Sequence, residues 1–408
     1  MSDSAPAPGL TFGEKVVVLA GGIIAAMALT VINPVLPAIE EALAQNATDK
    51  MLVKQLIGAV TLAMVVGAPA GGFFVERLGM RNLLLGASLV FAAGGTAGLY
   101  LSSLPLLLAS RLLVGASAAC IQVMSLTLIA TRLDAEGRAK WMGLHISTAI
   151  FCSLVVFPVA GLLGNAGWRM PFVLYLFGLV VFAALLFSKE GKAREQAEVE
   201  AEPLKDDVPL TRWMPWHYVI MSLFIGAITY LPTIYSPYLF VDQAGLSPFE
   251  ISLVFTASAL IGGVIALLYG KARQHLSVHV VFLVCFGGAA AGLAVVALAP
   301  SLSVMLAGFA IYTIGNAWFV ANTMTSLAGK VENHQQARAA GIVKAGHFVS
   351  TPIMVALVAP YAQRWGADAV MLLAAGMSAF ILLLIIGRMV TLGRVSVASP
   401  TMPQPARP

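Results

Sequence analysis

Four ionisable side chains stand within long apolar runs of this sequence: Arg111, His145, Lys344 and His347. An imidazole titrates near neutral pH, so a histidine inside an apolar run can take up and release a proton. Arginine and lysine are costly to place in lipid, and where they occur there they usually serve a function such as substrate binding. The four side chains therefore predict proton and anion chemistry inside a membrane.

The two histidines are related by their positions in the chain. They lie 202 residues apart, an offset at which other segments also repeat. Lys344, His347 and Thr351 are spaced i, i+3 and i+7, which places them on one face of a helix. We expect a proton-responsive pair, His145 and His347, beside the inner mouth of a central cavity. The alternative is a pair of hydrogen-bonded or interfacial histidines, since both stand in the cytoplasmic third of their predicted spans.

Acidic side chains are missing where a proton carrier usually has one. None of the 19 aspartates and glutamates falls deep in a predicted span, although a desolvated carboxylate is the common proton-binding group there. Arg111 and Lys344 then make the predicted cavity cationic. We therefore expect an anionic or zwitterionic solute to be handled more readily than an organic cation. Alternatively, each of the two side chains extends to a membrane interface.

Most of the chain is predicted to be membrane-spanning helix. Of its 408 residues, 59% are hydrophobic and 11% are charged, whereas soluble domains carry about 25% charged residues. A spanning helix needs about 20 apolar residues, and runs such as 381–386 do not alternate as barrel strands do. We predict an all-α membrane protein with twelve transmembrane helices. The predicted spans are 16–40, 52–75, 82–101, 104–131, 141–164, 168–188, 216–240, 250–270, 278–299, 301–327, 339–361 and 367–389.

The net charge of +5 is interpreted as an orientation signal. Most of the 24 lysines and arginines fall on the same side of the predicted membrane as both termini, and few, such as Lys50 and Arg364, fall opposite. Positive residues concentrate on the cytoplasmic side of membrane proteins. We expect a bacterial inner-membrane protein with both termini in the cytoplasm. Its partner is then the lipid bilayer and not a nucleic acid.

The chain divides into two halves with similar sequence features. Residues 33–36 and 236–239 end the first and seventh spans alike, and residues 158–164 and 360–366 end the fifth and eleventh spans alike. We predict a duplication that gives two pseudo-symmetric six-helix bundles, a known transporter plan. The predicted parts are a tail at 1–15, a bundle at 16–187, a linker at 188–215, a bundle at 216–395 and a tail at 396–408.

The loop between the second and third spans combines glycines with charged residues. It reads Gly72-Phe-Phe-Val-Glu76-Arg77-Leu-Gly79-Met80-Arg81. This segment resembles the cytoplasmic signature of the major facilitator superfamily, although Glu76 stands where aspartate is usual and Met80 replaces a basic residue. The resemblance implies a cytoplasmic gate, in which a glycine permits close helix contact and the acid forms a latch with the arginines. The alternative is a simple positive-inside anchor.

Three further segments resemble the proton-linked drug-efflux branch of that superfamily. They are Arg111-x-x-x-Gly115, Thr30-x-x-Asn33-x-x-Leu36-Pro37 and Pro158-x-x-Gly161. Two positions depart from the branch: Ala28 stands where it has aspartate, and Phe157 stands where it has glycine. The resemblance implies a twelve-helix carrier that exchanges a drug or metabolite for protons.

Polar and aromatic residues occur on spans 1, 4, 7 and 10, which line the pathway in the family that the chain resembles. The candidates for substrate contacts on these spans, besides Arg111, are Asn33, Gln122, Tyr230, Tyr235, Tyr312 and Asn316. Aromatic rings with a few polar groups suit a small-molecule site. Helix–helix packing is the alternative explanation for each of them.

We predict a secondary active transporter that moves a small organic solute by alternating access, as proton-coupled efflux. The sequence has no Gly-x-x-x-x-Gly-Lys-Ser/Thr loop, so ATP is not the expected energy source. We expect no metal, no cofactor and no enzymatic activity, and we expect a monomer. The alternatives are an uptake symporter or facilitator for an organic anion, which Ala28 favours, and a membrane-embedded enzyme or receptor.

Overall fold

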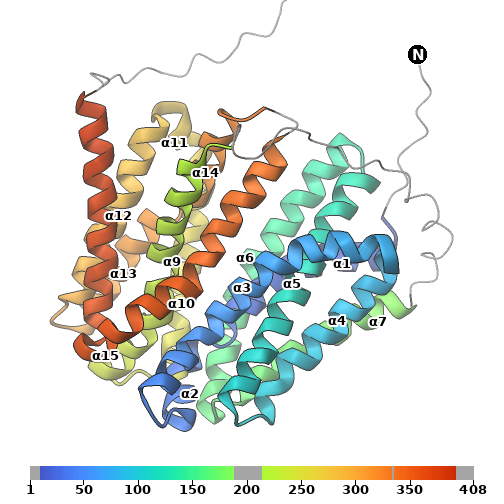
Figure 1. Cartoon of the computed structure of the whole chain (residues 1–408), viewed down its shortest axis with the longest axis horizontal. Coiled ribbons are helices and arrows are strands. Elements are labelled where there is room, and N and C mark those ends of the chain that lie inside the picture. Colours follow the sequence, from blue (N-terminus) through green and yellow to red (C-terminus); the bar gives the residue numbers. More distant parts are fainter. Residues whose placement is uncertain (1–9, 188–213, 333–334, 392–408) are drawn as a thin grey trace, which may run out of the picture. The chain divides into compact units, whose positions relative to one another are not determined.

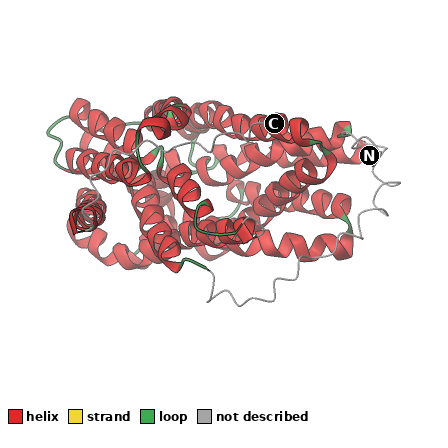
Figure 2. Ribbon diagram, turned by 90° about the horizontal axis from the view of Figure 1, so that it is seen from above, coloured by secondary structure: helices red, strands yellow, loops and turns green. Residues whose placement is uncertain are grey.

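The computed structural model describes residues 10–187, 214–332 and 335–391 (Figure 1). Every secondary-structure element in these ranges is a helix, as Figure 2 shows. The predicted all-α fold is therefore confirmed. Nearly all of the predicted linker at 188–215, the tail at 396–408 and most of the tail at 1–15 lie outside the described residues.

The helices follow one another with short connections. The part before residue 188 contains α1 (Phe12–Thr30), η1 (Asn33–Val35), α2 (Leu36–Leu43), α3 (Ala47–Leu78), α4 (Met80–Thr96), η2 (Ala97–Leu99), α5 (Leu104–Arg132), α6 (Ala135–Ala166), η3 (Met170–Leu176) and α7 (Phe177–Phe187). The later part contains α9 (Trp216–Ala244), α10 (Pro248–Leu267), α11 (Tyr269–His275), α12 (Val278–Ala297), α13 (Leu302–Asn316), α14 (Phe319–Ala328) and α15 (Gln336–Thr391).

The number of spans depends on one break in α15. Eleven helical segments within the described residues are long and apolar enough to cross a membrane, and the last of them is Arg338–Met389. That segment has non-helical backbone at Gly366, where φ is 84°. The break separates the predicted spans 339–361 and 367–389, so the described chain contains twelve spans, as predicted.

Helix ends follow from the local sequence. The side chain of Thr11 accepts a hydrogen bond from the Glu14 backbone N–H, and the Glu14 side chain accepts one from the Thr11 backbone N–H. This reciprocal capping box starts α1. Gly79 joins α3 directly to α4 with a φ of 76°, a left-handed conformation that glycine adopts without steric penalty.

Contacts divide the described chain into two compact units. Unit 1 contains the described residues up to 187 together with Phe240–Thr256 and Thr351–Ala359, and unit 2 contains the others. Each of α9, α10 and α15 therefore contributes residues to both units. The division into bundles at 16–187 and 216–395 stays a prediction.

Small residues bring α3 and α5 together in unit 1. A Cβ atom at Gly67 would lie 2.7 Å from Cα of Ala116, and one at Gly115 would collide with the carbonyl oxygen of Val60. Small residues at such contacts let helix backbones approach closely in a membrane. Gly115, which the sequence singles out after Arg111, is thus required by packing.

Large apolar side chains remain exposed on many helices. Leu267 is 83% exposed, Phe187 79% and Phe151 68%. Soluble monomers rarely expose large contiguous apolar surfaces. These side chains suit contact with lipid hydrocarbon.

Candidate functional site

His145 is held between α6 and α1 in unit 1. It is buried, and its Nδ1 lies 2.7 Å from the carbonyl oxygen of Val18. Thr148 donates to the carbonyl oxygen of His145 at 2.9 Å, and a Cβ atom at Gly22 would collide with that same oxygen. Because a carbonyl only accepts, Nδ1 carries the hydrogen and Nε2 is left as the ring atom for proton uptake.

His347 makes the same set of contacts between α15 and α9 in unit 2. Its ring forms a hydrogen bond with the backbone of Ser222. Ser350 donates to the carbonyl oxygen of His347 at 2.7 Å, and a Cβ atom at Gly226 would collide with that oxygen. The hydrogen-bonded alternative therefore describes both histidines, and their role in proton coupling stays a prediction.

The two histidine contacts match residue by residue. Thr148 and Ser350 are 202 positions apart, as the histidines are, and the matching positions of α1 and α9, Gly22 and Gly226, are 204 apart. In each unit a glycine, a histidine and a hydroxyl residue three positions after the histidine meet at one point. This repetition supports the predicted duplication.

Aromatic and basic side chains surround His347. Its ring centroid lies 5.3 Å from that of Tyr230 and 6.0 Å from that of Phe348. Lys344 is an exposed residue, and its Nζ lies 5.7 Å from the Phe348 ring centroid. We call Tyr230, Lys344, His347 and Phe348 the aromatic–basic cluster. Rings beside a positive charge can hold an aromatic anion, since the rings supply apolar contact and the ammonium supplies charge.

Tyr312 and Asn316 join α13 to α9 in unit 2. The Tyr312 hydroxyl donates to the carbonyl oxygens of Ile228, at 3.2 Å, and Thr229, at 3.1 Å. The Thr229 hydroxyl donates to Oδ1 of Asn316 at 2.9 Å. Tyr235 is 1% exposed, with Tyr238 as a ring neighbour at 6.4 Å. Helix–helix packing thus accounts for the contacts of Tyr312 and Asn316, whereas Tyr238 lies on the same helix as Tyr235. The predicted substrate contacts of all three residues remain untested.

Arg111 is enclosed by protein in unit 1. Its exposure is 0%, and its Nη2 donates to the carbonyl oxygens of Gly94 and Gly95, both at 2.9 Å. The rings of Phe172 and Tyr175 lie 5.1 Å and 4.9 Å from its Cζ. The guanidinium therefore satisfies backbone carbonyls where α4 ends, and it does not extend to an interface.

Asn33 and Gln122 occupy different environments in unit 1. Asn33 is 2% exposed in η1, where the first span is interrupted, and its Oδ1 has no hydrogen-bond partner among the residues that the structure describes. Gln122 is half-buried in α5. A buried amide oxygen without a partner is unusual, so Asn33 keeps its predicted place as a candidate acceptor.

The segment 72–81 forms the junction of α3 and α4. The Arg81 Nη2 donates to the carbonyl oxygens of Leu185 and Leu186, at 3.1 and 3.3 Å, in the last turn of α7. A cation there is favoured by the helix dipole. The Arg77 Cζ lies 4.2 Å from the Phe73 ring centroid.

Two residues of that segment differ from the expected gate. Glu76 is exposed and has no ion pair with any described residue. A Cβ atom at Gly72 would meet no heavy atom within 4 Å. The close helix contact expected at Gly72 is therefore not present there; Gly67 makes it one and a half turns earlier. The gating role stays a prediction.

Pro158 and Gly161 lie within the continuous helix α6. A Cβ atom at Gly161 would collide with the side chain of Ser252 in the first turns of α10. The rings of Phe157 and Phe255 stack beside it at 5.3 Å. Gly161, predicted from the antiporter-like segment, thus permits a close helix contact within unit 1.

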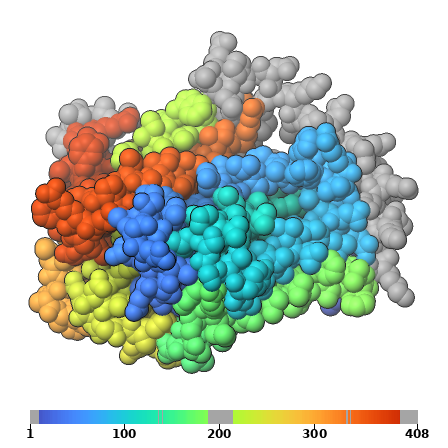
Figure 3. All heavy atoms as spheres, turned by 60° about the horizontal axis from the view of Figure 1, so that its bottom comes forward, coloured from blue at the N-terminus to red at the C-terminus, as the bar shows by residue number. Residues whose placement is uncertain are grey.

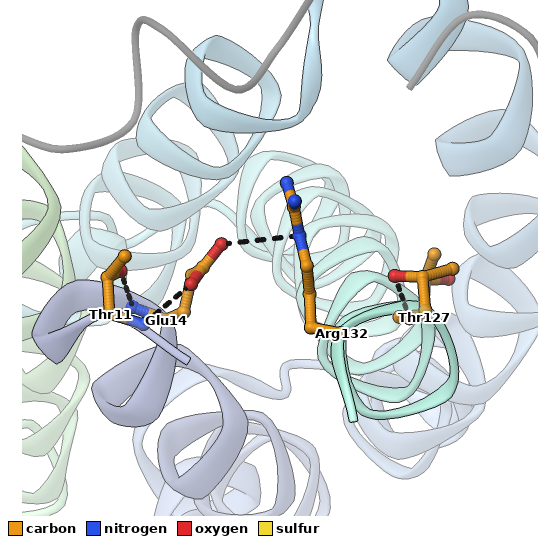
Figure 4. Close-up of polar contacts among 5 residues, drawn as sticks. Thr11, Glu14, Thr127 and Arg132 are labelled. Carbon is orange, nitrogen blue, oxygen red and sulfur yellow. Dashed lines mark hydrogen bonds and ion pairs between the residues drawn. The ribbon is translucent and has the colours of Figure 1, made fainter. Parts of the chain in front are cut away.

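Two ion pairs of unit 1 were not predicted from the sequence. Glu14 at the start of α1 pairs with Arg132 at the end of α5, with 3.7 Å between Oε1 and Nε (Figure 4). Lys54 of α3 pairs with Glu40 of α2. The spacing of Thr11 and Glu14 is a capping-box signal that could have placed Glu14 at a helix start, but the sequence holds no local signal for either pairing.

Comparisons with known proteins agree with this architecture. A family model described as Major Facilitator Superfamily matches residues 18–247 and 219–407. Multidrug resistance protein 2 of Bacillus subtilis (strain 168) is 24% identical over 274 residues, which cover 64% of this chain and 67% of that protein. Quinolone resistance protein NorA of Staphylococcus aureus is 23% identical over 252 residues, which cover 60% of this chain and 62% of that protein. A crystal structure of a D-xylose-proton symporter has a TM-score of 0.69 at 18% identity and covers 90% of this chain and 97% of that chain.

Proposed function

The chain belongs to the Major Facilitator Superfamily, and on that premise we propose that it exports a small organic compound from a bacterial cell in exchange for protons. It is a multi-pass membrane transporter and not an enzyme. Relatives named for multidrug and quinolone resistance support export. We expect a single chain in the inner membrane, with cytoplasmic termini, to expose a central site alternately to the two faces.

The aromatic–basic cluster is the observation that carries the substrate class. Lys344, an exposed residue, places its ammonium group near the ring of Phe348, and Tyr230 and His347 lie next to that ring. A positive charge among rings favours an aromatic anion or zwitterion, because the charge attracts the anion while the rings bury its apolar part. Arg111 would act indirectly, by fixing the end of α4.

Transport into inverted membrane vesicles tests the substrate class. Vesicles from cells that overproduce the protein should accumulate aromatic carboxylates when a proton gradient is applied, and control vesicles from a deletion strain should not. Strong accumulation of permanently cationic dyes together with none of the anions would refute the proposed class.

The histidines provide a test of proton coupling. Replacing His145 and His347 together by glutamine keeps hydrogen-bonding capacity but removes the titrating ring. We expect the dependence of transport on pH to flatten. The variant His279→Gln, which alters an exposed histidine of α12, serves as the control. A double variant with an unchanged pH profile would remove both histidines as coupling groups.

Uptake of an organic anion, by symport or facilitated diffusion, is the second candidate. Ala28, buried in α1, supports it because the first span then lacks the acid that the drug-efflux branch has at this position. Dissipating the proton gradient separates the candidates. Cells should retain more of an exported compound after the gradient collapses, and less of an imported one.

A further inference from the structure

Arg111 carries a buried charge that no acid neutralises in the part of the chain that the structure describes. The residue is 0% exposed and forms no ion pair with any described residue. The carbonyl oxygens of Gly94 and Gly95 accept from its Nη2, but they carry only partial charges. Arginine stays protonated in proteins, and a buried charge is normally paired because an isolated ion is costly to remove from water. The guanidinium therefore lacks a counter-charge.

Two polar atoms here have no partner at hydrogen-bond geometry among the described residues: Arg111 Nη1 and the Tyr175 hydroxyl. Tyr175 is also 0% exposed, and its ring centroid lies 4.9 Å from the Arg111 Cζ. Nη1 has two N–H groups and the hydroxyl has one hydrogen. If the hydroxyl accepts one of these N–H groups, the other N–H and the O–H still need an acceptor. Buried donors without an acceptor are rare, and an ion or a water molecule usually explains them.

Close packing between α4 and η3 holds these donors in place. A Cβ atom at Gly95 would collide with the Tyr175 side chain, and one at Gly98 would collide with the Phe172 ring. Figure 3 shows the turn from α4 to α5, in cyan, next to η3, in green. The rings of Phe91 and Tyr175 also meet edge to face, with 5.4 Å between their centroids. The donors are thus fixed before any ligand binds, which lowers the entropic cost of binding.

Arg169, a second arginine beside the end of α4, has its donors satisfied. Its Nη1 donates to the carbonyl oxygens of Gly98 and Leu101, at 2.9 and 2.7 Å, and its Nη2 donates to the Ser102 hydroxyl at 2.9 Å. Arg169 is only half-buried, so water screens its charge. Unpaired charge and free donors therefore coincide at Arg111 and not at its neighbour.

We propose that Arg111 Nη1 and the Tyr175 hydroxyl bind a small monovalent anion of the size of chloride. The anion accepts the free N–H and O–H groups, and its charge neutralises the guanidinium. A water molecule would accept the same hydrogen bonds but would leave the charge unpaired. The bound anion joins α5 to η3 and stabilises the end of α4, to which Arg111 is already bonded. This role is separate from the transported compound and from the direction of transport.

A chloride titration of the purified full-length protein tests the proposal. Sodium gluconate, whose anion is too large for an enclosed site, is replaced stepwise by sodium chloride at constant ionic strength. The midpoint temperature of thermal unfolding should rise by about 2–4 °C along a saturating curve, because a ligand that binds only the folded state stabilises it. Tyr175→Phe, which keeps the ring and removes one donor, should raise the half-saturating chloride concentration by about 10- to 100-fold, the effect of one hydrogen bond to a charged group.

Arg111→Gln should abolish the chloride effect, and Tyr175→Phe decides the matter if that variant does not fold. Arg169→Gln is the matched control, since it removes a neighbouring arginine and leaves both proposed donors in place. It should keep the parent's half-saturating concentration even where its unfolding temperature is lower. A parent protein without a saturable chloride effect, or a Tyr175→Phe variant with the parent's curve, would overturn the proposal. None of these measurements depends on transport.

Discussion

The histidine contact of unit 1 and that of unit 2 are alike in the backbone and differ in their surroundings. In both, a glycine of the first helix of the repeat lies against the histidine carbonyl oxygen, and a hydroxyl three residues later donates to that oxygen. Around His145 the contacts are small residues and α1 carbonyls, whereas Tyr230, Phe348 and Lys344 lie near His347. The packing framework is thus the same in both units, while aromatic and basic side chains gather around only one of the two histidines.

Removing the charge of Lys344, near His347 in unit 2, should have the largest effect on transport. We expect Lys344→Met to raise the KM for an anionic substrate by about 10- to 100-fold, because a charged hydrogen bond contributes about 1.5–3 kcal/mol. Transport into vesicles measures it, with Lys271→Met, an exposed residue of α11, as the control. Equal loss in both variants would mean that Lys344 acts only through general charge.

Adding a methyl group to either glycine tests whether the framework is shared. Gly22→Ala and Gly226→Ala should each lower the free energy of unfolding by about 1–3 kcal/mol, because each Cβ would enter the space of a histidine carbonyl oxygen. Thermal unfolding of the purified protein measures this. Gly86→Ala and Gly376→Ala, where a Cβ atom meets nothing within 4 Å, should be neutral or stabilising. Damage from only one of the first two variants would contradict a shared framework.

Losing one hydroxyl in each unit should have the smallest effect. Ser125 donates to the Val17 carbonyl oxygen at 2.9 Å, as Tyr312 does to those of Ile228 and Thr229. Ser125→Ala and Tyr312→Phe should each lower the stability by about 0.5–1.5 kcal/mol, the contribution of one hydrogen bond. If Tyr312 also contacts substrate, only Tyr312→Phe will slow transport at a temperature at which both variants remain folded. Transport equally slowed in both variants would assign Tyr312 to packing alone.

Local patterns predicted the fold, and they also predicted where the two histidines lie. Hydropathy alone located the twelve spans, because a membrane requires each helix to be apolar along its length. The shared offset of 202 residues anticipated that His145 and His347 would occupy matching places. Neither observation depends on knowing which helices touch.

Contacts between residues far apart in the chain could not be predicted from local sequence patterns. Gln55 donates to the carbonyl oxygen of Pro352, which lies 297 residues away in sequence, and no spacing rule links the two. Arg111 was expected to line the cavity, but its partners are the backbone carbonyls of Gly94 and Gly95, which sequence cannot identify. Similarly, Gly67 and not Gly72 makes the close contact of α3, because helix phase decides which glycine faces a neighbour.

The hydrogen bond from His145 Nδ1 to the Val18 carbonyl oxygen does not depend on the charge of the ring. Nδ1 donates to that oxygen in the neutral ring and in the charged ring alike, because the added proton resides on Nε2. The Nδ1 hydrogen bond to α1 is thus available in both forms of the ring. Any motion that follows protonation must then begin in the groups that sense the new field around Nε2.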